Sequence, residues 1–209
     1  FPAGMIGEMF SAYCRLIERL AEDEAPWTDV APAAPREKTD ATRHDANPAP
    51  QLLHAGFLRN AVAYPDRIAV IDGERKLSYG ELYQKAASLA ERLAKALPCN
   101  SDETPLVAVA LPKGWRQAVA VLGVLFAGAA YVPIEPGWPP LRRSAVLDEA
   151  MPLALVALEN EKSDEWNGLP VLSIGEEARI APVENFLKTD PQNLAYVIFT
   201  SGSTGTPKG

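Results

Sequence analysis

The segment with the clearest chemical signal is residues 200–209, which has the sequence TSGSTGTPKG. Glycines let the backbone adopt positive φ angles, so several N–H groups can turn toward one point. Concave arrangements of N–H groups bind anions. The hydroxyl side chains add donors, and Lys208 adds a compact positive charge suited to phosphate oxygens. The segment therefore predicts a cradle for a polyphosphate, formed by Thr200, Ser201, Gly202, Ser203, Thr204, Gly205 and Lys208.

Two other interpretations of this segment are weaker. A Walker A loop needs Gly-Lys-Ser/Thr at the start of a helix, whereas Lys208 stands between Pro and Gly, which suits a loop. A flexible Gly/Ser linker has a similar composition, but a β-branched and aromatic stretch, residues 194–200, directly precedes the segment. No catalytic residue and no set of metal ligands is identified. His44 and His54 have no Cys or carboxylate at metal-ligand spacing, so solvated or structural roles are expected.

From Gln51 onward, buried strands are expected to alternate with helices. The run 106–111 is entirely apolar, as in a strand that is covered on both faces. Ser78 and Glu81 form a capping-box pattern at a helix start. Further strands are predicted over 68–72, 131–134, 153–158 and 194–200, the last two buried, and helices within 77–97, 115–127 and 139–150. This order predicts an α/β fold with a substantially parallel sheet flanked by helices.

Three regions are expected along the chain. Residues 1–28 contain an amphipathic helix, because apolar side chains recur there at spacings of three and four. One helix cannot bury its own apolar stripe, so it must pack on another domain or on another part of its own domain. Residues 29–50 are rich in proline and alanine and predict a semi-rigid linker. Residues 51–209 form the α/β region.

The composition excludes several classes of protein. Twenty Lys and Arg against 27 Asp and Glu give a net charge of −7, and 47% of the residues are hydrophobic. This balance is typical of a globular chain and argues against nucleic-acid binding. The longest apolar run, 118–134, is too short for a bilayer span and contains a proline, so no membrane partner is expected. Cys14 and Cys99 are far apart, which favours a reducing, cytoplasmic setting.

The residues of the polyphosphate segment resemble the phosphate-loop signature of adenylate-forming enzymes. This superfamily contains acyl-CoA synthetases, luciferases and the adenylation domains of nonribosomal peptide synthetases. LSYGEL at 77–82 and LFAGAAYVPIEP at 125–136 resemble the first and second core motifs of the peptide-synthetase branch. Phe126, Glu135 and Phe199 stand where a basic residue, Asp and Tyr are frequent, and none of them lies in the phosphate loop. The resemblance covers residues 51–209 and implies the N-terminal part of an adenylation domain.

Residues 1–28 resemble the closing helix of a condensation domain, in particular of the heterocyclization variety. The linker at 29–50 is what a multidomain synthetase would place between such a domain and an adenylation domain. Heterocyclization domains act on Cys, Ser or Thr, so cysteine is the first candidate substrate. Synthetases of this kind make secondary metabolites, siderophores among them.

The resemblance implies a two-step activity. ATP, with Mg²⁺, and an amino acid would give an aminoacyl-adenylate and pyrophosphate, and the acyl group would then pass to the phosphopantetheine thiol of a carrier domain. Residues 200–205 would surround the β- and γ-phosphates, and Lys208 would supply charge. In this family the amino-acid pocket and a catalytic lysine follow the phosphate loop, so these 209 residues alone are expected to be inactive. Two rivals remain, an acyl- or aryl-CoA synthetase and a non-catalytic nucleotide-binding scaffold.

Overall fold

The computed structural model divides the chain into two compact units, Phe1–Pro48 and Ala49–Gly209. It describes residues 4–22, 51–98, 103–175, 182–187, 189–201 and 207–209. The predicted linker at 29–50 lies outside the described residues, as does His44. Within the described part, no helix combines the length and the apolar character needed to cross a membrane.

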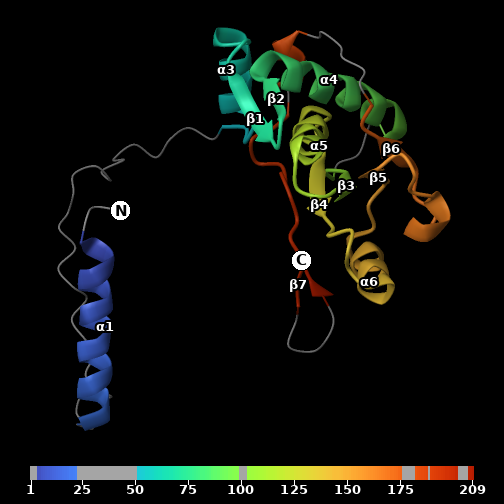
Figure 1. The fold of residues 1–209 in the computed structure, drawn as a ribbon. Helices are drawn as coiled ribbons and strands as arrows, with labels where there is room; N and C mark the ends of the chain where they lie inside the picture. The colour runs from blue at the N-terminus through green and yellow to red at the C-terminus, as the bar shows by residue number, and fades with distance from the viewer. Residues whose placement is uncertain (1–3, 23–50, 99–102, 176–181, 188, 202–206) are drawn as a thin grey trace. The chain divides into compact units, whose positions relative to one another are not determined.

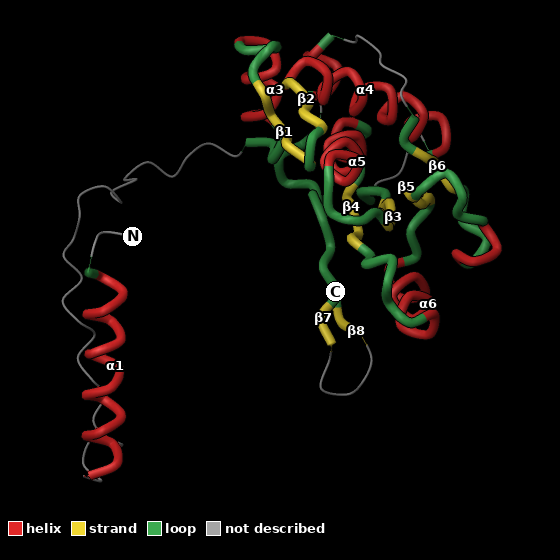
Figure 2. Tube along the Cα trace, in the orientation of Figure 1, coloured by secondary structure: helices red, strands yellow, loops and turns green. Residues whose placement is uncertain are grey.

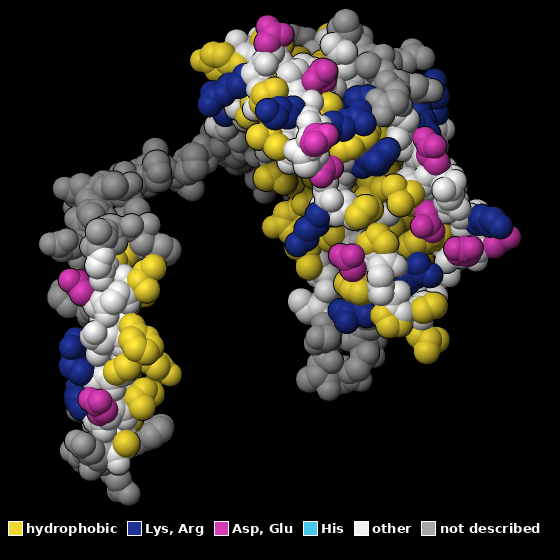
Figure 3. All heavy atoms as spheres, in the orientation of Figure 1, with side chains coloured by type: hydrophobic (Ala, Val, Ile, Leu, Met, Phe, Trp, Pro, Cys, Tyr) yellow, Lys and Arg dark blue, Asp and Glu magenta, His cyan; other side chains and the backbone are white. Residues whose placement is uncertain are grey.

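The first unit contains helix α1, Met5–Glu22, which confirms the predicted amphipathic helix. Its apolar side chains gather along one side in Figure 3, with charged side chains on the other. Four of them, Ile6, Met9, Phe10 and Tyr13, are each more than half exposed. The helix therefore presents an uncovered apolar face within this unit.

The second unit begins with a helix, a hairpin and a long helix. These are α3 (Ala55–Ala63), β1 (Ile68–Asp72), β2 (Arg75–Ser78) and α4 (Tyr79–Ala96), and the two strands pair antiparallel. The predicted capping box is confirmed. The N–H of Glu81 donates to Oγ of Ser78 at 3.2 Å, and the N–H of Ser78 donates to Oε2 of Glu81 at 2.8 Å. The first four N–H groups of a helix have no partner within the helix, and these two hydrogen bonds provide partners for two of them in α4.

A four-stranded parallel sheet forms the centre of the second unit, in the strand order β4-β3-β5-β6. Its strands and crossover helices are β3 (Leu106–Ala110), α5 (Trp115–Phe126), β4 (Ala130–Pro133), α6 (Pro140–Ala150), β5 (Ala154–Ala157) and β6 (Val171–Ser173). Two short 3₁₀ helices follow β5 and β6, at Ser163–Trp166 and Val183–Phe186. Figures 1 and 2 show α4 and α5 on one side of the sheet and α6 on the other. The predicted α/β fold with a parallel sheet flanked by helices is confirmed.

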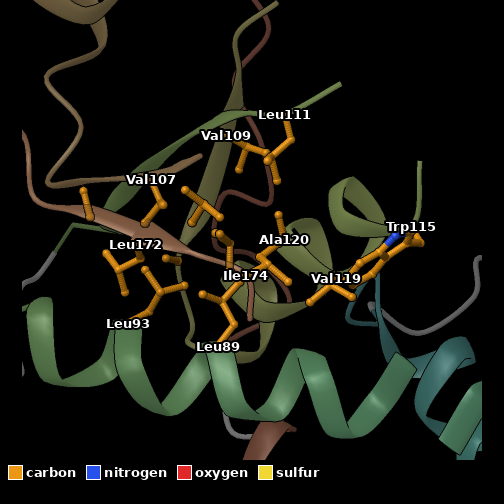
Figure 4. Close-up of a cluster of buried hydrophobic side chains, with 14 of the residues drawn as sticks. Leu89, Leu93, Val107, Val109, Leu111, Trp115, Val119, Ala120, Leu172 and Ile174 are labelled. Carbon is orange, nitrogen blue, oxygen red and sulfur yellow. The ribbon is translucent and has the colours of Figure 1, made fainter. Parts of the chain in front are cut away.

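Side chains of the central strands alternate between two apolar clusters. Val107 and Val109 point into the cluster under α4 and α5, where Leu89 and Leu93 of α4 point toward the sheet (Figure 4). Ala108 of the same strand belongs to the opposite cluster, which α6 covers. Both faces of β3 are therefore buried, as its uninterrupted apolar run predicted.

One predicted strand differs from the structure. Residues 194–200 were expected to form a buried strand, but only Tyr196 pairs with the main sheet, through one parallel bridge to Tyr131 of β4, and Thr200 pairs with Lys208 instead. Leu194 and Ile198 are 58% and 56% exposed, so the prediction of burial was wrong for this side of the segment. The reason is position: this segment lies at the sheet edge beyond β4, and only alternate residues, such as Val197, reach the core.

Candidate functional site

The predicted phosphate segment folds back on itself at the edge of the sheet. Strands β7 (Thr200–Ser201) and β8 (Pro207–Lys208) pair antiparallel, with Thr200 opposite Lys208. The structure thus brings together the two ends of the segment, which the sequence separates by seven residues. The side chains of Ser201 and Lys208, and residues 202–206 with Gly202, Ser203, Thr204 and Gly205, lie outside the described part. Their contact with phosphate remains a prediction.

The hairpin is attached to the sheet through the residues just before it. The N–H of Tyr131 donates to the carbonyl of Ala195 at 3.1 Å, and the N–H of Val197 donates to the carbonyl of Tyr131 at 3.0 Å. Val197 and Phe199 pack against the cluster on the α6 side of the sheet. Parallel strands direct their carboxyl ends toward one edge, where α/β proteins bind ligands. The hairpin therefore lies where this type of sheet places its binding sites.

Helix α6 forms the other side of this region, because it also follows a carboxyl end, that of β4. Strand β8 contacts α6. At the start of this helix Arg142 stacks over the ring of Trp138, and Arg143 over that of Trp166. These arginines received no separate role from the sequence. Both follow the predicted strand at 131–134, but only the structure shows that this strand is the neighbour of 194–200.

Two side chains of the second unit, Tyr131 and His54, have shifted pKa values. Burial raises the pKa of the Tyr131 phenol, and the neighbouring Tyr196, with its ring 5.6 Å away, raises it further. His54 is buried, and its Nε2 lies 2.7 Å from the carbonyl oxygen of Phe186. Burial lowers the pKa of His54, and the hydrogen bond to Phe186 partly offsets this effect. His54 thus joins the chain at the start of α3 to residues 183–186, which is the structural one of the two roles expected for it.

The described residues contain no group of three or more His, Cys, Asp or Glu side chains suited to a metal ion. The edge that holds β7 and β8 carries hydroxyl and cationic residue types, Thr200 and Lys208 among them, and such groups bind oxyanions.

Comparison with known proteins decides the family. The family model described as "AMP-binding enzyme" matches residues 57–209, which is more than half of the chain. The chain belongs to the AMP-binding enzyme family. The predicted membership among adenylate-forming ligases is thereby confirmed.

Curated relatives align with the whole chain of this AMP-binding enzyme. Pyochelin synthetase PchF from Pseudomonas aeruginosa is 39% identical over 211 aligned residues, which cover 100% of this chain and 11% of the relative. Phenyloxazoline synthase MbtB from Mycolicibacterium paratuberculosis is 38% identical over 215 aligned residues, covering 100% of this chain and 18% of the relative. The chain thus spans less than a fifth of the length of these two relatives.

Solved structures agree with the family assignment. A malonyl-CoA ligase in complex with methylmalonyl-CoA and AMP has a TM-score of 0.57 and 30% identity, over 69% of this chain and 29% of that one. IdnL7 has a TM-score of 0.58 and 31% identity, over 73% of this chain and 33% of that one. The AMP-binding fold of this chain therefore corresponds to about a third of each of these solved chains.

Proposed function

We propose that residues 51–209 are the N-terminal part of an adenylation domain in a nonribosomal peptide synthetase. This domain activates an amino acid with ATP, releases pyrophosphate, and loads the acyl group onto the phosphopantetheine thiol of a carrier domain. The observation that supports this most directly is the pairing of Thr200 with Lys208 at the carboxyl edge of the sheet, in a chain of the AMP-binding family. The similarity to pyochelin synthetase supports the peptide-synthetase branch.

The chemical task of the hairpin follows from the reaction. When a carboxylate attacks the α-phosphorus, negative charge develops on the departing pyrophosphate, and positioned donors and cations stabilise it. Backbone N–H groups and hydroxyls of residues 200–205 supply the donors, and Lys208 supplies the positive charge. The pairing of Thr200 with Lys208 would hold these two sources on the same side of the bound phosphates. The resemblance also implies Mg²⁺, which would neutralise part of the phosphate charge when bound.

The domain boundaries 1–28, 29–50 and 51–209 are part of the proposal. Helix α1 closes an upstream condensation or heterocyclization domain, which covers its exposed apolar face. Two observations support this: the apolar face of α1 is exposed, and curated relatives align over the full chain, including this helix. Cysteine remains the first candidate amino acid because of the proposed heterocyclization neighbour.

One alternative has an observation in its favour. The malonyl-CoA ligase shares 30% identity with this chain, so an acyl-CoA synthetase remains a second candidate. The two candidates differ in the thiol that accepts the acyl group, which is coenzyme A in one and a carrier-bound phosphopantetheine in the other.

The deciding experiment is ATP–pyrophosphate exchange by the full-length protein with each amino acid, cysteine first. We expect one amino acid to stimulate exchange well above the others, and Lys208→Ala to lower that exchange by about tenfold or more, as for loss of a charged hydrogen bond. Exchange that requires a non-amino carboxylic acid, followed by release of an acyl-CoA, would support the second candidate. An exchange rate unchanged by Lys208→Ala would remove the role given to this residue.

A further inference from the structure

We propose that a cavity beside the chain that enters α3 is a binding site for a small, ring-sized molecule that donates an O–H or N–H hydrogen bond to Nδ1 of His54. The site is separate from the hairpin β7–β8, so its test is independent of the proposed function. Three features of the described residues support it: the size and location of the cavity, a histidine nitrogen without a partner, and the composition of the cavity wall.

The first feature is the cavity itself. Its volume is about 160 Å³, and its wall comes from three segments that are far apart in the sequence, within residues 51–54, 125–129 and 189–195. In Figure 1 the chain that leads into α3 runs beside the red segment that leads to β7. A protein cavity of about 150 Å³ can hold benzene. This cavity therefore has room for a single six-membered ring.

The cavity lies at the opposite end of the sheet from the hairpin. Ala129 is part of its wall and directly precedes β4, so the cavity is at the amino end of this strand. Leu194 and Ala195 also line it, and the same segment continues through Tyr196, parallel to β4, to β7. A ligand bound here would contact the chain before it reaches the candidate phosphate site, and not that site itself.

The second feature is the fixed orientation of the His54 ring. His54 is only 3% exposed. Its Nε2 lies 2.7 Å from the carbonyl oxygen of Phe186, and its ring packs edge-on against Phe126 with the ring centres 5.4 Å apart. Because a carbonyl only accepts hydrogen bonds, Nε2 carries the proton, and Nδ1 of the neutral ring is an acceptor.

This acceptor, Nδ1 of His54, has no hydrogen-bond partner among the residues that the structure describes. Within the same residues, Nε of Arg143 is the one side-chain nitrogen or oxygen that is closed off from solvent and lacks a partner, so Nδ1 of His54 is open to solvent. His54 lines the cavity and is otherwise almost completely buried, so the cavity is the route to Nδ1. A largely desolvated acceptor without a partner costs stability, and a donor on a bound ligand would offset that cost.

The third feature is the composition of the cavity wall, which is mainly apolar. Leu52, Leu125 and Ala129 are among its apolar residues, and Thr189 and Asp190 add a hydroxyl and a carboxylate. Binding sites for small molecules commonly combine an apolar wall with a few polar groups that fix the orientation of the ligand. A neutral imidazole nitrogen and a carboxylate both accept hydrogen bonds, so the wall favours a ligand that donates them and disfavours an anion.

The ligand chemistry follows from the size of the cavity and from its acceptors. A neutral molecule with one apolar ring and one O–H or N–H group matches both. Phenol is such a molecule, and toluene has the same size without a donor. A cavity that is only apolar would bind toluene at least as tightly as phenol, because burial of a hydroxyl without a hydrogen bond is costly. A preference for phenol therefore reports an acceptor inside the cavity.

The test measures binding of phenol and of toluene to the full-length protein by isothermal titration calorimetry. We expect phenol to bind about tenfold more tightly than toluene, the factor for one buried hydrogen bond. His54→Gln keeps an N–H that can donate to Phe186 and removes the acceptor at Nδ1. It should therefore bind phenol about tenfold more weakly than the parent and toluene within about twofold of it. Arg59→Gln, also on α3 but outside the cavity wall, is the matched control and should bind both ligands as the parent does.

Each of three results would overturn the assignment of this cavity. The parent protein binds no phenol, it binds toluene as tightly as phenol, or a folded His54→Gln protein binds phenol as the parent does. If His54→Gln does not fold, a crystal structure of the parent protein with phenol decides instead. A phenol oxygen within hydrogen-bond distance of Nδ1 would support the site, and phenol bound only elsewhere would overturn it. ATP–pyrophosphate exchange plays no part in these measurements, so the proposed function is tested separately.

Discussion

Gly209 lies so close to the ring of Phe199 that any side chain at this position would force a neighbouring group to move. A Cβ atom on Gly209 would be 2.7 Å from Cζ of Phe199 and 2.9 Å from Cγ1 of Val197. Gly209, which follows β8, is therefore packed against the residues that precede β7. Phe199 in turn packs against the cluster on the α6 side of the sheet, so this contact connects Gly209 to that cluster.

Gly209→Ala tests whether that contact positions the phosphate site. The added methyl group must displace Phe199 or the end of β8, so we expect ATP binding by the full-length protein to weaken by roughly tenfold, the equivalent of about 1.4 kcal/mol. Isothermal titration calorimetry measures this. Gly137→Ala is the control, because a Cβ at Gly137 meets nothing within 4 Å. Equal ATP affinities for both variants and the parent would show that the contact does not position the site.

Gly123→Ala should destabilise the fold without acting at the phosphate site. A Cβ at Gly123 of α5 would come 2.7 Å from Cδ2 of Leu89 on α4, and overpacking of this kind costs about 1–3 kcal/mol. Urea unfolding monitored by tryptophan fluorescence would detect the loss. In α3, Gly56→Ala meets only Nη2 of Arg59 at 3.7 Å, so higher helix propensity should make it neutral or stabilising. A stable Gly123→Ala protein would mean that α4 and α5 can separate at little cost.

The elements that the sequence predicted correctly are those whose formation depends mainly on residues close to one another in the sequence. Ser78 and Glu81 lie one helical turn apart, and the capping box depends on no other residue. The apolar run that contains Val107 and Val109 needs only coverage on both faces, which a parallel sheet with helices on each side provides. The capping-box pattern indicates where a helix begins, and the uninterrupted apolar run indicates a strand that is buried on both faces.

For the segment 194–200, the local sequence pattern could not predict its place in the sheet. Its composition favours a strand, but whether a strand is central or at an edge depends on its neighbours, which lie far away in the sequence. The pairing with Tyr131 is such a long-range contact, and it leaves Leu194 and Ile198 exposed. The proximity of α6 to β8 is of the same kind, and no local pattern in the sequence predicted it.

The buried His54 predicts a loss of stability in mild acid. Its pKa is lowered from the ordinary value of 6.5, so below that value the unfolded chain takes up this proton more readily than the folded protein. Its contribution to stability is therefore complete above pH 6.5 and decreases as the pH falls toward the lowered value. A carbonyl only accepts hydrogen bonds, so neutral His54 must donate from Nε2–H to Phe186.

The measurement for His54 is urea unfolding at pH 7.5 and pH 5.5. Carboxylates also titrate as the pH falls, so the relevant quantity is the difference between the parent protein and His54→Gln. We expect the free energy of unfolding of the parent to decrease more between these two pH values than that of the variant. Parallel losses in the two proteins would show that protonation of His54 does not affect the fold.

The exposed face of α1 gives a test of the proposed upstream domain. If a condensation-type domain covers this face in the full-length protein, Phe10→Glu would place a charge in an apolar interface, and leaving a charge buried and unpaired costs several kcal/mol. We expect this variant to lose protection of α1 in hydrogen exchange and to be cleaved faster by protease between residues 1 and 50. Glu18→Gln, on the charged side of the same helix, should show neither effect. Identical exchange for Phe10→Glu and Glu18→Gln would mean that water, and not a neighbouring domain, surrounds the apolar face.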